Sequence, residues 1–169
     1  MVLVVVVVLL VIGLAIYYAV SIKGVQETAG KLSEVEATVL VNIIDSMPEV
    51  QCSMRGSPKD CVDAVKLQAF KSVVESHKNV YIDRLGFKVV RFERIYPVPE
   101  KSKLRLADGE CDNNAYYDPF FPETCGNWTV YSHPKPNYRF KDIVKTPVSL
   151  FFPTNKAYYV GVLYVEVYR

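Results

Sequence analysis

The chain has 169 residues, of which half are hydrophobic, with 20 lysines and arginines against 18 aspartates and glutamates. Because both signs are scattered along the chain, the sequence lacks the clustered basic face that nucleic-acid binding usually requires. It has no G-x-S-x-G, H-E-x-x-H, P-loop or G-x-G-x-x-G motif, and neither His77 nor His133 has a recognisable catalytic partner nearby. We therefore expect a protein that is not an enzyme, has no cofactor or metal, and binds no nucleic acid.

The first charged residue of the chain is Lys23, so residues 1–22 are entirely uncharged. An apolar helix of about 20 residues spans the ~30 Å hydrocarbon core of a bilayer, and lipid offers backbone groups no other partner. The sequence therefore predicts a transmembrane or filament-core helix over residues 1–22. Signal anchors normally begin with a positively charged region, which is missing here. Either a short basic leader lies upstream, which we favour, or the hydrophobic anchor suffices unaided.

Apolar residues continue to recur every three or four positions from Val25 to Met47, and Pro48 ends the pattern. This spacing predicts that residues 23–48 form an amphipathic extension of the first helix. The extension is either a stalk that packs on its own domain or an assembly surface that bundles with copies of itself. The residues expected on the assembly surface are Val5, Leu9, Ile12, Ile16, Val25, Leu32, Val39 and Ile43.

Four cysteines form two closely spaced pairs, which favours the disulfides Cys52–Cys61 and Cys111–Cys125, although four cysteines allow three connectivities. Zinc sites favour C-x2–4-C spacing, which neither pair has. Behind a membrane segment, disulfides indicate an oxidising compartment, so we expect a cell-surface or extracellular protein that is membrane-anchored before assembly. The sequon at Asn127 agrees with this location and makes Asn127 a candidate glycosylation site.

Residues 49–169 are expected to form an extracytoplasmic α+β domain. Ser57 as N-cap and Pro58 in the first turn predict a helix from Pro58 to about Glu75, with His77 capping its last carbonyls. Short strands are expected over residues 80–82, 128–131 and 138–140, and a longer one over residues 87–96. The clearest strand pair covers residues 148–152 and 158–168, with a turn at 153–156. In the last strand, alternation predicts a core-facing set of Gly161, Leu163, Val165 and Val167.

A long irregular loop is expected from residue 100 to 125, stapled by Cys111–Cys125. Its acidic part, residues 108–114, does not match the EF-hand spacing, so a solvated loop is preferred to a calcium site. The loop also carries a cluster of aromatic residues, which either form a contact surface or cover the sheet as a small satellite core. These residues are Tyr116, Tyr117, Phe120 and Phe121.

This layout resembles archaeal type IV pilin-like proteins, the superfamily of pilins and archaellins. The resemblance is carried by the uncharged run Val2–Ile22, its extension Val25–Met47, and the strand-rich domain that ends with Gly161–Tyr168. In that family a basic leader is cleaved just before the apolar helix. The mature helices then bundle into a filament core, with the β-domains outward.

Together these patterns predict a long N-terminal membrane or filament-core helix, followed by a small disulfide-stapled antiparallel β-rich domain with one additional helix. The resemblance implies a structural subunit of an extracellular pilus-like filament or cell-envelope assembly that polymerises through its N-terminal helix. Its partners would be copies of itself and, before assembly, the membrane; no small-molecule substrate is identified. The alternative is a solitary membrane-anchored binding domain that uses the aromatic and acidic loop 108–125.

Overall fold

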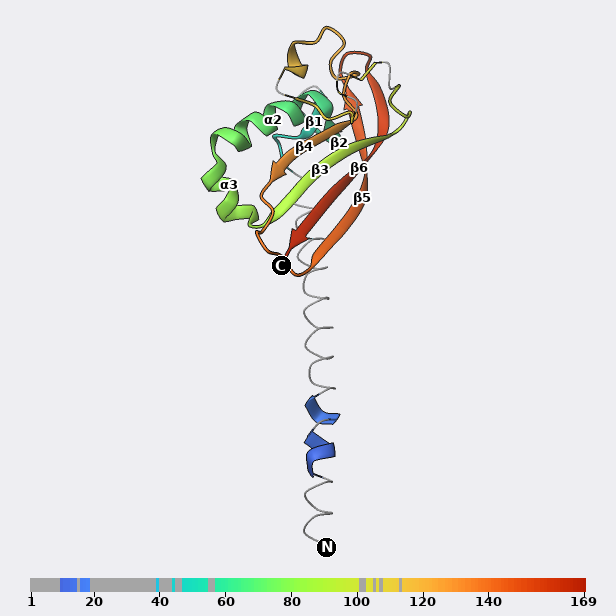
Figure 1. Cartoon of the computed structure of the whole chain (residues 1–169). Helices are drawn as coiled ribbons and strands as arrows, with labels where there is room; N and C mark the ends of the chain where they lie inside the picture. Colours follow the sequence, from blue (N-terminus) through green and yellow to red (C-terminus); the bar gives the residue numbers. More distant parts are fainter. Residues whose placement is uncertain are drawn as a thin grey trace, which may run out of the picture. The chain divides into compact units, whose positions relative to one another are not determined.

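The computed structural model describes residues 10–14, 16–18, 39, 44, 47–54, 57–100, 103–104, 106, 108–112 and 114–169. The chain divides into two compact units, Met1–Glu36 and Ala37–Arg169. The residues described in the first unit, 10–14 and 16–18, are helical. The elements of the second unit are labelled in Figure 1.

The residues that the structure describes do not contain the predicted long N-terminal membrane or filament-core helix. Within the described ranges, no helix is both long enough and apolar enough to cross a membrane. Of the expected assembly residues, Ile12, Ile16 and Val39 are helical and exposed. The others lie outside the described residues: Val5, Leu9, Val25, Leu32 and Ile43.

Six strands of the second unit form one sheet, in the order β1-β2-β5-β6-β3-β4 (Figure 1). The strands are β1 Gln51–Met54, β2 Ser57–Asp63, β3 Lys88–Tyr96, β4 Asn127–Ser132, β5 Lys141–Phe152 and β6 Ala157–Tyr168. All neighbours are antiparallel except β2 and β5, which are parallel. The prediction of an antiparallel domain was therefore wrong. A parallel neighbour needs a long crossover connection, and the chain between β2 and β5 supplies one.

Two α-helices, not the predicted one, follow β2: α2 Ala64–Ser76 and α3 Lys78–Leu85. Helix α2 starts at Ala64 because the Asp63 carboxylate accepts the N–H groups of Val65 and Lys66, at 2.9 and 3.3 Å. The predicted start at Pro58 was wrong, since residues 57–63 pair in the sheet as β2 instead.

Helix α3 occupies residues 80–82, where a strand was predicted. The apolar run there is only three residues long, and Tyr81 packs edge-on against Phe70 of α2, with ring centroids 5.7 Å apart. His77 lies between the two helices. Its ring Nδ1 is 3.2 Å from the Val73 carbonyl oxygen, so the prediction that it caps the end of α2 is confirmed.

Helix α2 packs on one face of the sheet, where the hydrophobic core lies. Its residues Leu67 and Phe70 join Phe92, Trp128 and Leu150 in that core. Strand β6 turns the four residues predicted from its alternation toward this face, and all four are buried. The opposite face of β3, β5 and β6, which we call the open face, is more exposed and carries Tyr158, Val160, Val162 and Tyr164 on β6.

Strands β5 and β6 form the longest pairing in the sheet. Their register runs from Lys141 opposite Tyr168 to Phe152 opposite Ala157. The prediction placed the start of β5 at residue 148 and so missed its first half, in which charged and apolar residues mix. The predicted strand at residues 138–140 is irregular instead, after Asn137 with a positive φ of 56°.

Candidate functional site

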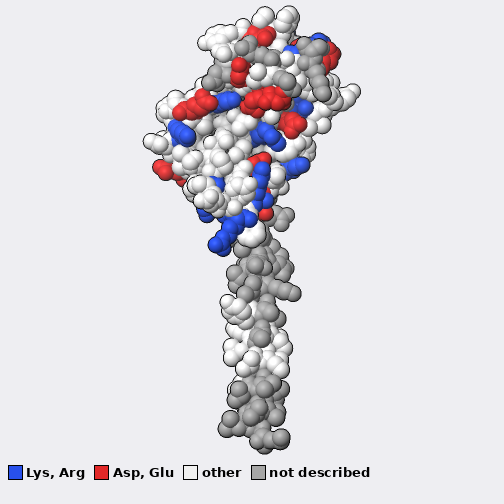
Figure 2. Space-filling view, in the orientation of Figure 1, with Lys and Arg blue, Asp and Glu red and all other residues white. Residues whose placement is uncertain are grey.

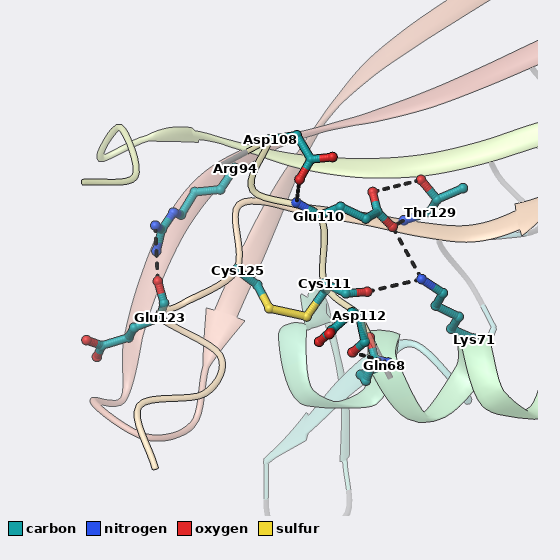
Figure 3. The surroundings of a disulfide bond; sticks show 10 residues. All are labelled: Gln68, Lys71, Arg94, Asp108, Glu110, Cys111, Asp112, Glu123, Cys125 and Thr129. Carbon is teal, nitrogen blue, oxygen red and sulfur yellow. Dashed lines mark hydrogen bonds and ion pairs between the residues drawn. A yellow bond between two sulfur atoms is a disulfide. The ribbon is translucent and has the colours of Figure 1, made fainter. Parts of the chain in front are cut away.

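Both predicted disulfides are present. Cys52–Cys61 joins β1 to β2, and Cys111–Cys125 closes the loop that leads into β4. Such bonds persist mainly in oxidising compartments. The second disulfide lies at the end of the sheet where the loop between β3 and β4 meets α2 (Figure 3).

Glu110 fastens this loop to the edge of the sheet. Its Oε1 accepts the Thr129 N–H at 3.0 Å, and its Oε2 accepts the Thr129 hydroxyl at 3.0 Å (Figure 3). Lys71 of α2 lies 3.3 Å from Glu110 Oε1 and also donates to the Cys111 carbonyl at 3.0 Å. Since β4 is an edge strand, no further strand of the described chain pairs with it on this side. The Glu110 carboxylate accepts the Thr129 N–H there, as a neighbouring strand would.

The acidic part of the loop is held by hydrogen bonds within the protein. Asp108 Oδ1 accepts the Glu110 N–H at 3.1 Å, while the Glu110 carboxylate is occupied by Lys71 and Thr129. In the part of the chain that the structure describes, no group of three or more His, Cys, Asp or Glu residues is placed to hold a metal ion.

We expect Glu110→Ala to lower the free energy of unfolding by about 1–3 kcal/mol, because it leaves the Thr129 N–H without its acceptor and leaves Lys71 with the Cys111 carbonyl alone. Glu100 is the matched control, since its ion pair with Lys103 is exposed. Glu100→Ala should change stability by less than about 0.5 kcal/mol. Urea unfolding of both variants measures the difference, and equal losses would show that the Glu110 network is not structural.

The aromatic residues of the loop divide between the two expected roles. Phe121 is buried in the core at 7% exposure, whereas Tyr117 and Phe120 are exposed at 83% and 69%. The side chain of Tyr116 lies outside the described residues. The loop therefore contributes one aromatic anchor to the core and presents two aromatic side chains at the surface.

Arg94 is a buried cation with few hydrogen bonds. It is 7% exposed, and its guanidinium lies 5.4 Å from the Phe152 ring centroid and 5.6 Å from that of Tyr159. Its Nη2 donates to the Glu123 carbonyl at 3.4 Å (Figure 3), while its Nε has no hydrogen-bond partner in the described part of the chain. Burial lowers the pKa of Arg94, and the nearby Tyr159 and Glu123 oppose that shift.

Arg94 also lines a groove of about 440 Å³ beside β3, the start of β4 and the loop between them. We call it the polar groove. Its lining residues are Arg91, Glu93, Arg94, Ile95, Val98, Pro99, Leu104, Asp108, Gly109, Gly126 and Asn127. Two of these residues also have a buried side-chain atom without a hydrogen-bond partner among the described residues, namely Arg91 Nε and Asn127 Oδ1. The Arg91 guanidinium lies 4.8 Å from the ring centroid of Tyr164 on the open face.

The sequon residue Asn127 is the first residue of β4. Its backbone N–H donates to the Gly109 carbonyl at 2.9 Å, and its carbonyl accepts the Cys111 N–H at 2.8 Å. The backbone of Asn127 is therefore bonded to the loop between β3 and β4, and Asn127 is one of the residues that line the polar groove. Glycosylation of Asn127 stays a prediction.

The polar groove was not predicted from the sequence. A usable signal was present in β3, where Arg91, Glu93 and Arg94 follow the apolar pair Val89 and Val90. His133 has no part in the groove and stacks on Phe87 with ring centroids 5.2 Å apart. Basic and acidic side chains are interspersed over the face of the second unit shown in Figure 2, so charge does not single out one part of that face.

Comparisons with known proteins found no matching family model, no similar curated protein and no similar solved structure.

Proposed function

We propose that this chain is a structural subunit of an extracytoplasmic, pilus-like assembly, in which the apolar N-terminal segments of neighbouring copies pack against one another. The observation that carries this proposal is a group of seven large apolar side chains in the first unit, each between 50% and 72% exposed. They are Leu10, Val11, Ile12, Leu14, Ile16, Tyr17 and Tyr18.

Seven such side chains within nine residues make a contiguous apolar surface. Burying apolar surface is worth about 25 cal/mol per Å², and exposed patches of this kind mark interaction sites. The surrounding residues 1–22 carry no charge that would favour a polar partner. A second copy of the same segment is a suitable partner, because contact between the two buries apolar surface on both copies.

Two further observations support this proposal. The two disulfides suit an oxidising location outside the cytoplasm. The layout of the sequence resembles that of archaeal type IV pilin-like proteins, whose N-terminal segments form the core of a filament. The disulfide-stapled sheet domain would then be the part displayed on the surface of the assembly.

The exposed Tyr117 and Phe120 favour a second candidate function, in which the domain binds a partner through the loop 108–125. Aromatic side chains are enriched at the centres of protein interfaces. If the chain binds a partner through this loop, substitutions in the loop should abolish its function. If the chain assembles, substitutions in the N-terminal segment should do so, and one experiment therefore separates the two functions.

We expect Ile12→Glu in the full chain to abolish assembly, because a carboxylate buried among apolar side chains costs several kcal/mol unless it is neutralised. Sedimentation velocity and negative-stain electron microscopy should show ordered filaments for the wild-type chain and a shift to single subunits for Ile12→Glu. The control is the double variant Tyr117→Ser/Phe120→Ser, which alters exposed side chains of the second unit and should assemble like the wild type.

Two results would contradict the proposal. One is a wild-type chain that forms no ordered assembly. The other is assembly that survives Ile12→Glu. Loss of partner association only in Tyr117→Ser/Phe120→Ser would assign the function to the loop instead.

A further inference from the structure

We propose that the sheet domains of neighbouring copies contact one another end to end, with a basic segment of one copy against an acidic loop of the next. The acidic loop is residues 108–125, and the basic segment is residues 133–141. This inference rests on the proposed assembly and adds to it a contact between the domains. The partner of each segment is a second copy of this chain.

The two segments carry opposite charge. Residues 108–125 include five aspartates and glutamates and no lysine or arginine, whereas residues 133–141 include three lysines and arginines and no aspartate or glutamate. Lys135 and Arg139 of the basic segment are exposed, and neither forms an ion pair with another described residue. Opposite charges across an interface align two partners and exclude wrong ones.

Asp118 and Glu123 are the carboxylates of the acidic loop best placed for such a partner. Glu110 is held within the fold by its ion pair with Lys71. Asp118 Oδ1 accepts a backbone N–H at 2.8 Å, and Glu123 Oε1 accepts a side-chain N–H of Asn155 at 3.0 Å. Both of these donors are neutral, so the carboxylates keep their negative charge.

In both segments, a charged residue lies between two exposed aromatic residues in the sequence. The charged residues are Asp118 and Arg139, which have opposite signs. Contact between aromatic side chains excludes water, and an ion pair is stronger in such surroundings. The aromatic residues are Tyr117 and Phe120 in the acidic loop and Tyr138 and Phe140 in the basic segment, each between 49% and 83% exposed.

The two segments lie at opposite ends of β4 (Figure 1). The acidic loop comes just before Asn127, where β4 begins, and the basic segment follows Ser132, where β4 ends. The basic segment is fixed to the last residue of the chain. The Arg139 N–H donates to the Arg169 carbonyl at 2.7 Å, and the Arg169 N–H donates to the Phe140 carbonyl at 3.1 Å. A contact between two different surfaces repeats from copy to copy, as a filament requires, unless the copies close into a ring.

This contact should align neighbouring domains without deciding whether the chains assemble. Exposed ion pairs contribute little free energy but favour one alignment of the partners, whereas burial of the apolar N-terminal segments provides the main attraction. The variant Tyr117→Ser/Phe120→Ser keeps every charge, so it should still assemble as expected above.

Cross-linking of the full chain tests the contact directly. A zero-length carbodiimide joins a lysine amine to a carboxylate that touches it. In an equal mixture of unlabelled and isotope-labelled chains, we expect peptides that contain both forms and join Lys135 to Asp118 or Glu123. Such mixed peptides come only from two copies. Raising NaCl from about 0.05 M to about 0.5 M should lower their yield severalfold, because salt screens exposed charges.

Charge reversal identifies the pair. Arg139→Asp and Asp118→Arg should each lower the yield of the mixed Lys135–Glu123 peptide about tenfold, because like charges then meet. An equal mixture of the two variants, or a chain with both substitutions, should restore the yield to within about twofold of the wild type. A misfolded variant could not be rescued in this way. The matched control is Arg84→Asp on the exposed surface of α3, which should cross-link like the wild type.

Three results overturn this inference. The first is a wild-type chain without mixed peptides, and the second is a yield that the paired reversals do not restore. The third is a loss in Arg139→Asp but not in Asp118→Arg, which would assign the basic segment to a different partner.

Sedimentation keeps this test separate from that of the proposed function. The charge-reversal variants should still sediment as assemblies, whereas Ile12→Glu should not. Mixed peptides from a wild-type chain that forms no filaments would support the end-to-end contact and contradict assembly through the N-terminal segment. Filaments without mixed peptides would do the reverse.

Discussion

Trp128→Ala is expected to lower the free energy of unfolding by about 3–5 kcal/mol, the typical cost of removing a large aromatic side chain from a core. Trp128 is fully buried on β4 and packs edge-on against Phe152 of β5, with ring centroids 6.1 Å apart. It also lies opposite Phe92 in the register of β3 and β4. Its loss leaves a cavity where three strands meet the core.

The loss in free energy of unfolding should depend on the size of the cavity and not on removal of the indole N–H group. Trp128 Nε1 has no hydrogen-bond partner in the described chain, so Trp128→Phe removes no hydrogen bond and should cost much less than Trp128→Ala. The surface control is Tyr117→Ala, which should change stability by less than about 0.5 kcal/mol. Urea unfolding followed by circular dichroism is the suitable measurement, because Trp128 is the only tryptophan and its fluorescence is lost in the variants. A loss below about 1 kcal/mol for Trp128→Ala would contradict this packing.

Removal of the Cys111–Cys125 disulfide, as Cys111→Ala/Cys125→Ala, is expected to cost about 3 kcal/mol. The bond closes a loop with a sequence separation of 14 and so restricts the unfolded chain. Both sulfur atoms belong to fully buried residues, and alanine avoids placing a new polar group there. The loop also supplies Glu110 to the edge of β4, so its hydrogen bonds should loosen when the staple is gone.

The Cys52–Cys61 disulfide is the matched comparison. Its separation is 9, for which the same chain-entropy argument gives about 2.6 kcal/mol. Hydrogen exchange should rise around residues 108–126 in the first variant and around β1 and β2 in the second. If urea unfolding shows no loss of stability on removal of Cys111–Cys125, this disulfide does not stabilise the folded domain and the prediction is wrong.

Local patterns predicted several features correctly because their causes are local. The alternation in β6 identifies its buried face, since successive side chains of a strand point to opposite sides. The close spacing of Cys52 and Cys61, and of Cys111 and Cys125, favours short-range pairing. The turn after Phe152 joins two apolar strands that pair directly.

Other features depend on contacts between distant segments, and the predictions failed there. Ser57 and Pro58 are good helix-start residues, but the strand pairing of residues 57–63 determines their structure. The helix begins at the cap that Asp63 provides instead. For residues 80–82, packing of Tyr81 on Phe70 accompanies a helix where the local β-propensity favoured a strand.

The sequence by itself determined the uncharged character of the N-terminal segment and the core-facing residues of β6, and its cysteine spacing favoured the pairing that the structure shows. These follow from composition, spacing and a two-residue period, which need no knowledge of distant neighbours. Only the tertiary structure decided that β2 runs parallel to β5, that Phe121 is buried while Tyr117 is exposed, and that Arg91, Arg94 and Asn127 line one groove. The physical reason is that each of these depends on which strands become neighbours, and burial and hydrogen bonding between segments far apart in the chain select that arrangement.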